Sequence, residues 1–384
     1  MSHIKVCSVN EEGRFGGPER RVVEIAKALK ERGIDTHVVY PAYDSERYSQ
    51  ELLKAGIRNT SLNITRLTLE KKVLARYIFT FFLDILRLYL FLRRHKFDLV
   101  QVNGTPQCKG ALAAKMAGIP VVWVIEDTKM PFIVRKIYTL IAKYSAAGII
   151  FVGKRVYDYY IRGSMLESKL SIEIHAPVDT SIFDPNHVVP DKRMNQIQGR
   201  KIVTVSGISP VKGLKYFIKM ASELIQRYND LAFFVAGAKL SSQKKYSRYI
   251  KKLIASTGLT SDNYFFYGII DDVPSFLQGA DIFVCTSISE ASPMAVWEAM
   301  SMGKAVVTTD VGSVRQYIED GISGFIVPVM DSKALTIKVE ELLNNPALRE
   351  KMGAEARLVA KKKLDVSIAA DKYALFYKRV LKQN

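Results

Sequence analysis

The residues after Cys285 are those whose types and spacing most clearly indicate chemistry. An apolar run ends at Cys285, and Ser292-Pro293-Met294-Ala295 then opens an apolar, helix-forming stretch. Serine is a good helix N-cap and proline a good first helical residue, so the amides of Met294 and Ala295 are expected to lack intrahelical acceptors. Free amides at the positive end of a helix dipole favour an anion.

Two carboxylates accompany this predicted anion site, Glu290 in the preceding loop and Glu298 inside the helix. Carboxylates repel an anion, so they are useful here only if they bind neutral groups such as hydroxyls. A ligand with phosphates in its middle and polyols at both ends satisfies both demands. The pattern therefore indicates a nucleotide sugar.

Two further loops follow predicted strands. Lys212 ends the loop at residues 206–213, where its ammonium either supplies a point charge to a diphosphate or is simply solvated. Gly16 and Gly17 follow the first strand and allow a backbone to come close to a ligand, although a plain turn explains them equally well.

The elements that must position these loops are short apolar strands alternating with amphipathic helices, a pattern that favours parallel sheets covered on both faces. The predicted strands lie at residues 5–10, 36–40, 99–103, 121–125 and 149–152, and then at 201–206, 232–236, 264–267, 282–285, 305–308 and 325–327. We predict two doubly wound α/β domains, residues 1–185 and 200–366, joined by a polar linker at 186–199.

Taken in order, these motifs resemble the retaining, nucleotide-sugar-dependent glycosyltransferases of family four, also called glycosyl transferases group 1. The resemblance extends over nearly the whole chain and is most specific between residues 265 and 328, where Glu290 and Glu298 match a Glu-x7-Glu signature. It implies the GT-B fold, in which two Rossmann-like domains face each other across a cleft. It also implies that the last helix, within residues 367–384, returns to the first domain.

The resemblance assigns expected roles to particular residues. Glu290 would contact the hydroxyls of the donor sugar, Glu298 the ribose, and Lys212 the phosphates. The remaining donor-binding residues implied by the matching motifs are Gly16, Gly17, Gly207, Gly268, Ser292, Met294 and Ala295.

The sequence departs from the family pattern at three positions near these groups, one of which is Ala291, where glycine is common after the first glutamate. Ser206-Gly207 stands where the family often has Gly-Arg, so one positive charge for the diphosphate is missing. Glu126 stands where many members carry a histidine beside the reacting sugar carbon. We therefore take Glu126, Asp127 and Glu290 as the catalytic candidates, with capping of the next segment as the alternative role for Asp127.

The implied reaction is transfer of a hexose-type sugar with retention at the anomeric carbon. The chain has no Asp-x-Asp triplet and no His, Cys or Asp cluster with ligand spacing, so neither a metal nor another cofactor is expected. Arg14, Arg20, Asn103 and Thr105 are the candidate contacts for a glycan or lipid-linked acceptor, and a turn or solvated arginines are the alternative.

The composition shows 56 Lys and Arg against 38 Asp and Glu, a net charge of +18 divided equally between residues 1–190 and the remainder. Such a charge attracts phosphorylated molecules, anionic lipid or nucleic acid. Three widely separated cysteines suit a reducing cytoplasm.

Residues 70–96 predict a long helix too charged to span a bilayer, since Asp84 and Arg87 interrupt it. We favour a core helix packed on the first sheet over an interfacial helix that attaches the protein peripherally to anionic lipid on the inner face of the cell membrane, although one helix could do both.

Two other classes of function remain open. A sugar-nucleotide epimerase or a disaccharide phosphorylase would share the architecture, but few acids and bases for epimerisation stand in the first half. A non-catalytic basic protein that binds membrane or nucleic acid is less favoured, because no nucleic-acid motif or basic stripe with interleaved aromatic residues is present.

Overall fold

The computed structural model describes residues 3–383 except 69, 129 and 240–242. The chain divides into two compact units: unit 1 comprises Met1–Ala176 and Val366–Asn384, and unit 2 comprises Pro177–Asp365. Each unit is an α/β layer structure built on one parallel sheet.

Unit 1 contains a seven-stranded sheet in the order β3-β2-β1-β4-β5-β6-β7, with every strand pair parallel. Its strands are β1 (Ile4–Asn10), β2 (Ile34–Pro41), β3 (Arg58–Leu62), β4 (Leu99–Asn103), β5 (Val121–Ile125), β6 (Ala146–Phe151) and β7 (Ser171–Glu173). Its helices are α1 (Gly17–Lys30), α2 (Glu46–Lys54), α3 (Lys71–His95), α4 (Cys108–Met116), α5 (Phe132–Ser145), α6 (Lys154–Tyr160) and α15 (Val366–Gln383).

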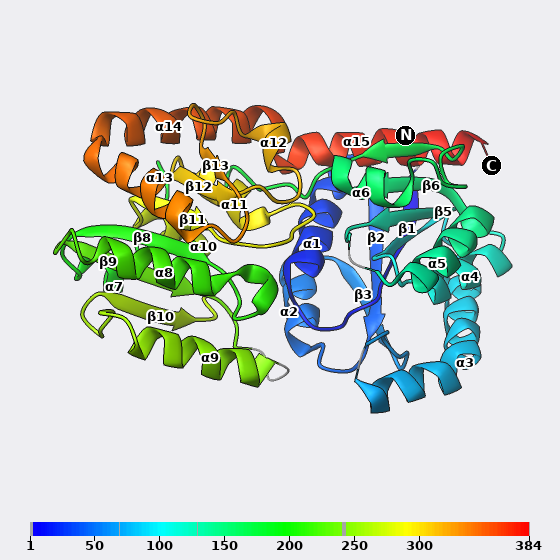
Figure 1. Cartoon of the computed structure of the whole chain (residues 1–384). Helices are drawn as coiled ribbons and strands as arrows, with labels where there is room; N and C mark the ends of the chain where they lie inside the picture. The colour runs from blue at the N-terminus through cyan, green and yellow to red at the C-terminus, as the bar shows by residue number, and fades with distance from the viewer. Residues whose placement is uncertain (1–2, 69, 129, 240–242, 384) are drawn as a thin grey trace. The chain divides into compact units, whose positions relative to one another are not determined.

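The C-terminal helix α15 belongs to unit 1, as the family resemblance implied, although residue 384 lies outside the described residues. Figure 1 shows it as the red helix beside β6. Gly148 of β6 makes this packing possible, because a Cβ there would lie 2.8 Å from atoms of Phe376 and Val380. An ion pair of 2.6 Å between Arg32 and Asp371 also ties the end of α1 to α15.

Unit 2 contains a six-stranded parallel sheet in the order β10-β9-β8-β11-β12-β13 (Figure 1). Its strands are β8 (Arg200–Val205), β9 (Leu231–Ala236), β10 (Tyr264–Gly268), β11 (Ile282–Cys285), β12 (Ala305–Thr309) and β13 (Phe325–Val327). Its helices are α7 (Lys192–Asn195), α8 (Leu214–Leu224), α9 (Lys244–Ala255), α10 (Val273–Gln278), α11 (Met294–Ser301), α12 (Val314–Tyr317), α13 (Ser332–Asn344) and α14 (Pro346–Val359). A 3₁₀ turn (Pro210–Lys212) and a π-helical turn (Ala360–Leu364) complete it.

Alternate residues of each central strand in unit 2 enter different cores, which explains why these strands are apolar throughout. In β9, Phe233 packs in the core formed with α8 and α13, whereas Phe234 packs in the core formed with α10 and α11. In β11, Ile282 packs in the first of these cores and Phe283 in the second. Both faces of the sheet are therefore covered by helices.

The predicted linker at residues 186–199 is not a linker, because the whole segment belongs to unit 2. Asp191 accepts hydrogen bonds from the backbone N–H groups of Arg193 and Met194 and so caps the short helix α7. The Met194 side chain is fully buried, and a Cβ on Gly279 would lie 3.2 Å from its sulfur. Met194, the partly buried Val188 and Ile197 and the cap hold this segment against unit 2, and they do not produce a periodic pattern. The chain instead passes between the units after Ala176 and again after Asp365.

The edge strands β3 and β7 were missed for a similar reason. None of their residues is fully buried, so they lack the apolar runs by which the central strands were predicted.

Helix α3 occupies the region predicted at residues 70–96, and only one of its faces is buried. Asp84 lies on that face with a fully buried side chain, and it accepts hydrogen bonds from the N–H of Thr65 (2.9 Å) and from Lys109 Nζ of α4 (3.0 Å). Burial opposes its ionisation, but the hydrogen bonds from Thr65 and the Lys109 ammonium outweigh burial and lower the pKa of Asp84. The charge that interrupts the apolar sequence thus anchors α3 to α4. Among the described residues, no helix is both long and apolar enough to cross a membrane.

Candidate functional site

The predicted donor-binding residues of unit 2 gather at the carboxyl edge of its sheet. Gly207 follows β8, Gly268 ends β10, and Glu290 lies in the loop after β11. In the sheet order, β8 and β11 are neighbours from which the chain proceeds in opposite directions. Loops at such a switch point diverge and leave room for a ligand.

Lys212 and Glu290 meet directly in this cluster. Lys212 Nζ donates to Glu290 Oε1 at 2.5 Å, and the hydroxyl of Ser287 donates to the same oxygen at 2.8 Å. Burial alone would lower the pKa of the Lys212 ammonium, but the nearby Glu290 carboxylate outweighs burial, and the pKa of Lys212 is raised. The two residues predicted to bind phosphate and sugar therefore form an ion pair with each other.

Two glycines fix the backbone around this pair. Gly213 has a φ of +65°, and a Cβ there would lie 2.0 Å from the carbonyl oxygen of Thr286, so only glycine allows this approach. Gly312 has a φ of +53°, and a Cβ there would lie 2.5 Å from the carbonyl oxygen of Ala291. The loops after β8, β11 and β12 are thus locked together by backbone contacts on both sides of Glu290.

Helix α11 begins one residue later than predicted. Pro293 rather than Ser292 occupies the N-cap position, and the hydroxyl of Ser292 instead accepts a hydrogen bond from Trp297 Nε1 at 3.1 Å. Because the helix starts at Met294, the N–H groups of Met294 and Ala295 precede the first intrahelical acceptor. Both residues are half-buried at the edge of the sheet, so the helix end on which the prediction depends is formed, and anion binding there stays a prediction.

Glu298 lies one turn into α11, and its side chain is only 4% exposed. The other two predicted donor contacts are glycines at strand ends. A Cβ on Gly207 would lie 3.6 Å from the carbonyl oxygen of Ala238, which is an ordinary contact distance. Gly268 has a φ of +69°, and its carbonyl accepts a hydrogen bond from the N–H of Gly237 at 2.7 Å.

In unit 1, the glycine loop after β1 forms the start of α1. Gly16 is the N-cap, and its N–H donates to the carboxylate of Glu19 at 3.0 Å in a capping box. Burial raises the pKa of Glu19 to about 8. Gly16 and Gly17 therefore hold the end of a helix, which is compatible with a plain structural turn as well as with close approach to a ligand.

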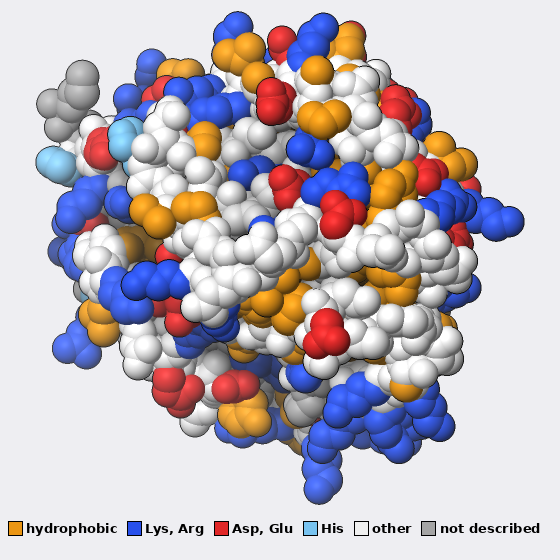
Figure 2. Space-filling view, turned by 90° about the vertical axis from the view of Figure 1, so that its left-hand side faces the viewer, with side chains coloured by type: hydrophobic (Ala, Val, Ile, Leu, Met, Phe, Trp, Pro, Cys, Tyr) orange, Lys and Arg blue, Asp and Glu red, His pale blue; other side chains and the backbone are white. Residues whose placement is uncertain are grey.

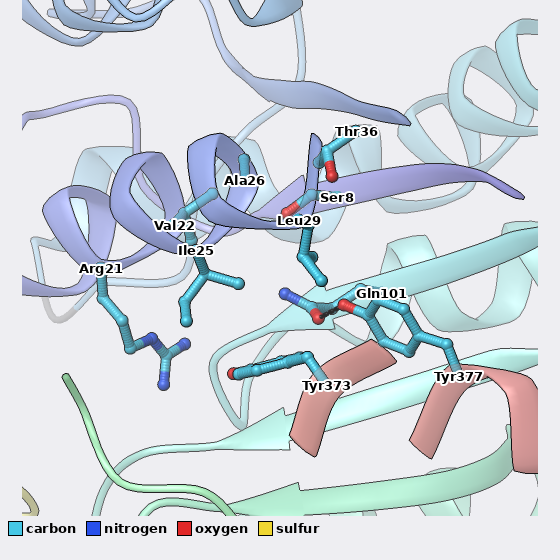
Figure 3. Close-up of a pocket in the computed structure, with 10 residues that line it drawn as sticks. All are labelled: Ser8, Arg21, Val22, Ile25, Ala26, Leu29, Thr36, Gln101, Tyr373 and Tyr377. Atoms are coloured by element: carbon cyan, nitrogen blue, oxygen red, sulfur yellow. Dashed lines mark hydrogen bonds between the residues drawn. The ribbon is translucent and has the colours of Figure 1, made fainter. Parts of the chain in front are cut away.

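Glu126 is held by a buried arginine that the sequence did not single out. Arg21 Nη2 of α1 donates to Glu126 Oε1 at 2.6 Å, with side-chain exposures of 2% for Arg21 and 16% for Glu126. Figure 3 shows Arg21 reaching from α1 toward Tyr373 of α15 at a small cavity. Burial raises the pKa of Glu126, and Arg21 limits that rise. The ion pair joins the helix that follows the glycine loop to the end of β5.

Asp127 and Thr105 are brought together as hydrogen-bond partners. The hydroxyl of Thr105 donates to Asp127 Oδ2 at 2.5 Å, and the hydroxyl of Tyr160 donates to Asp127 Oδ1 at 2.7 Å. Asp127 thus connects the loops after β4 and β5 to α6. Capping of the next segment, the alternative considered for Asp127, does not describe these contacts.

The other acceptor candidates in unit 1 have local partners. Asn103 is buried and donates to Asn10 Oδ1 at 2.7 Å, so it ties together the ends of β1 and β4. Arg14 pairs with Glu12 at 2.6 Å and Arg20 with Glu24 at 3.0 Å. No three His, Cys, Asp or Glu side chains of the described residues gather in a group that could hold a metal ion. The expectation of a metal-free, cofactor-free reaction remains a prediction.

Sequence reasoning missed three residues that the structure places in these clusters, Ser287, Arg21 and Tyr160, and also Lys239, whose Nζ lies 4.2 Å from the centroid of the Phe266 ring of β10. Lys239 follows β9 at the same edge as Gly207, where the N–H of Ile208 donates to the carbonyl of Ala238 at 2.9 Å. For Ser287 and Lys239, the sequence did offer a signal, because each residue closely follows a predicted strand. Arg21 and Tyr160 lie within helices and gave none.

Two family models match the chain. Residues 15–181 match the model described as Glycosyltransferase Family 4, and residues 191–359 match the model described as Glycosyl transferases group 1. Together these matches extend over most of both units. The chain therefore belongs to this family of glycosyltransferases.

Curated relatives agree with this assignment. An alpha-D-kanosaminyltransferase from Streptomyces kanamyceticus is 30% identical over 183 residues, which cover 47% of this chain and 45% of that protein. The N,N'-diacetylbacillosaminyl-diphospho-undecaprenol alpha-1,3-N-acetylgalactosaminyltransferase of Campylobacter jejuni is 25% identical over 378 residues, 93% of this chain and 94% of that protein. The Campylobacter jejuni protein is matched over nearly its whole length, whereas the chain matches only about half the length of the other curated relatives.

Solved structures share the fold. Anabaena Alr3699/HepE, in complex with UDP and glucose, has a TM-score of 0.83 at 20% identity and covers 98% of this chain and 100% of its own. A glycosyltransferase from Rickettsia africae has a TM-score of 0.82 at 20% identity and covers both chains completely. The fold is therefore GT-B, with its two Rossmann-like units.

Proposed function

We propose that this chain transfers a hexose-type sugar from a nucleotide diphosphate sugar to a hydroxyl of a glycan or lipid-linked acceptor, with retention at the anomeric carbon and without a bound metal. The observation that carries the proposal is the cluster of Lys212, Glu290 and the N-terminus of α11 at the carboxyl edge of the unit 2 sheet. It combines a positive charge, free amides and a carboxylate within one set of loops.

Donor binding would exchange partners within this cluster. The diphosphate accepts hydrogen bonds from the amides of Met294 and Ala295 and takes the Lys212 ammonium from Glu290. The released Glu290 carboxylate, still held by Ser287 at 2.8 Å, then accepts hydrogen bonds from sugar hydroxyls. The same amides and ammonium stabilise the charge that develops on the leaving nucleoside diphosphate.

The unit 1 carboxylates would position the reacting groups. Arg21 holds Glu126 and the pair of Thr105 and Tyr160 holds Asp127, so both carboxylates have restrained orientations. The acceptor hydroxyl attacks the anomeric carbon from the leaving-group face and gives its proton to the departing phosphate oxygen. Such a reaction needs positioning and charge stabilisation more than a strong base.

Two comparisons support the choice of substrates. The Campylobacter jejuni relative is named for a diphospho-undecaprenol-linked acceptor, and Anabaena Alr3699/HepE is a structural neighbour solved with UDP and glucose. We accordingly assign this chain to polysaccharide or glycolipid biosynthesis in the cytoplasm, with peripheral contact to the membrane that holds a lipid-linked acceptor.

The donor site is tested by thermal shift and by release of nucleoside diphosphate with a panel of nucleotide sugars. Lys212→Met is expected to weaken donor binding by at least about tenfold, because one charged hydrogen-bond donor to the diphosphate is lost. The matched control is Lys215→Met on α8, where Nζ lies 4.8 Å from the centroid of the Tyr216 ring. Equal effects of the two substitutions, or no stabilisation by any nucleotide sugar, would contradict the proposed site.

Product analysis separates transfer from the two alternatives. A labelled nucleotide sugar should yield a labelled glycan or lipid only when acceptor is supplied. An isomerised nucleotide sugar formed without acceptor would indicate an epimerase, and a sugar phosphate formed only with inorganic phosphate would indicate a phosphorylase. Glu290→Gln and Glu126→Gln are expected to lower turnover, and near-normal turnover of the Glu126→Gln variant would remove Glu126 from the mechanism.

A further inference from the structure

Helix α3 of unit 1 exposes a continuous apolar stripe. Six large apolar side chains on its outer face are between 48% and 85% exposed: Ile78, Phe79, Phe82, Leu83, Leu86 and Leu90. They recur every three to four residues, so they lie along one side of the helix, opposite the buried Tyr77, Asp84 and Leu88.

Helix α5 exposes a second stripe on the same layer of helices. Five of its large apolar side chains are between 52% and 72% exposed: Phe132, Ile133, Ile137, Leu140 and Tyr144. Figure 1 shows α4 beside α3 and α5 on one side of unit 1. Of the 25 large apolar side chains that are exposed in the described part of the chain, eleven lie on α3 and α5. This is far more than scattered surface residues would give.

The same helices hold the positive charge of the first half of the chain. Helices α3, α4 and α5 together contain eleven Lys and Arg but one acidic residue, Asp84, so they carry a net charge of +10. Residues 1–190 as a whole carry a net +9, with 28 Lys and Arg and 19 Asp and Glu. The charge that looked evenly distributed along the sequence is therefore concentrated on one layer of unit 1.

We propose that the exposed faces of α3 and α5, hereafter the α3–α5 face, dock on the surface of a bilayer that contains anionic lipid. The apolar stripes would enter the acyl boundary, and the Lys and Arg at their ends would meet lipid phosphates. A second copy of this chain is a poor occupant, because α3 and α5 together contain nine Lys and Arg and one acidic residue, and two such faces would repel each other. Docking does not require the proposed transfer activity, but it would bring unit 1 to the surface where a lipid-linked acceptor resides.

A second basic surface provides an internal comparison. Helix α9 of unit 2 carries five exposed cations, Lys244, Lys245, Arg248, Lys251 and Lys252, and no acidic residue. Figure 2 shows a group of Lys and Arg side chains at the lower right of the face that it presents. On α9 only Tyr249 is a large exposed apolar residue. This helix can attract anions, but it lacks the apolar stripe needed to enter a bilayer.

The test uses the full chain and sedimentation with two kinds of vesicle, phosphatidylcholine alone and phosphatidylcholine mixed with phosphatidylglycerol. We expect binding to the mixed vesicles that is reduced but not abolished by high salt. Phe79→Ser with Phe82→Ser should weaken it by at least about tenfold, since two of the most exposed aromatic side chains are removed. The matched control removes two exposed side chains elsewhere, Ile337→Ser with Leu375→Ser, and should bind as the parent does.

Charge reversal on the two helices completes the test. Arg93→Glu with Arg94→Glu at the end of α3 should weaken binding by at least about tenfold, whereas Lys251→Glu with Lys252→Glu on α9 should change it little. Equal losses for the two pairs, or complete loss of binding in high salt, would show general attraction of a basic protein and would overturn docking by the α3–α5 face. Unchanged binding of the Phe79 and Phe82 variant would overturn it as well. Donor binding, measured on the same variants by thermal shift, reports folding and the proposed function separately.

Discussion

Replacing Arg21 with methionine is expected to destabilise unit 1 by about 3–5 kcal/mol, the usual result of removing one partner of a buried ion pair. Methionine retains much of the aliphatic part of the arginine side chain. The loss of stability therefore comes mainly from leaving the buried Glu126 carboxylate without its partner. That carboxylate loses a partner 2.6 Å away in a site where its own side chain is 16% exposed. Removing both charges in Arg21→Met with Glu126→Gln should recover about 1–3 kcal/mol, because no unpaired buried charge remains.

The pH dependence of this variant follows from the buried carboxyl group. Burial raises the pKa of Glu126, and the arginine that limits the rise is absent in Arg21→Met. The folded-state pKa of Glu126 then lies above the unfolded value of about 4.3. At pH values above the folded-state pKa the variant bears the full cost of the buried charge, and that cost falls as the pH drops through this pKa and the carboxyl takes up a proton. The difference in unfolding free energy between parent and variant should therefore be largest at neutral pH.

The measurement can be confined to unit 1. The chain has two tryptophans, Trp123 in β5 and Trp297 in α11. A Trp297→Phe background leaves Trp123, which is buried next to the Glu126 loop, as the fluorescence reporter of urea unfolding. A coupling energy between Arg21 and Glu126 below about 0.5 kcal/mol would refute the assignment of Glu126 to this ion pair, as would a destabilisation that does not change with pH.

Three further outcomes are expected. Gly312→Ala should weaken donor binding and lower Tm more than Gly321→Ala. Both glycines have a positive φ, but only a Cβ at Gly312 would meet a neighbour, 2.5 Å away at the carbonyl oxygen of Ala291. Equal effects of the two substitutions in thermal shift would argue against the loop contact. Asp84→Asn should destabilise unit 1 by about 3–5 kcal/mol in urea unfolding at neutral pH. Because the pKa of Asp84 is lowered, its contribution is fully present above the unfolded value of about 3.9 and is lost as the pH falls through the folded pKa, so parent and variant should converge in acid. Lys239→Met should weaken donor binding if Lys239 supplies the positive charge missing at Gly207, and unchanged titrations would exclude that role.

The central strands and the order of the loops could be predicted from the sequence, because buried parallel strands are apolar runs and their loops are marked by glycine, proline and charged residues. The predicted cluster at the edge of unit 2 follows from this alternation together with the residue types in the loops. The polar edge strands β3 and β7 and the segment around Met194 escaped prediction, because isolated contacts hold them in place rather than a periodic apolar face.

By itself the sequence determined which loops share the carboxyl edge of each sheet and which charged residues those loops contain, including Lys212, Glu290, Glu126 and Asp127. Only the tertiary structure decided their partners: Lys212 with Glu290, Arg21 with Glu126, and Thr105 with Asp127. It also decided that the apolar residues of α3 and α5 are divided between a core and an exposed face. The physical reason is that local patterns are set by neighbours along the chain, whereas ion pairs and exposure depend on residues that are brought together only by packing.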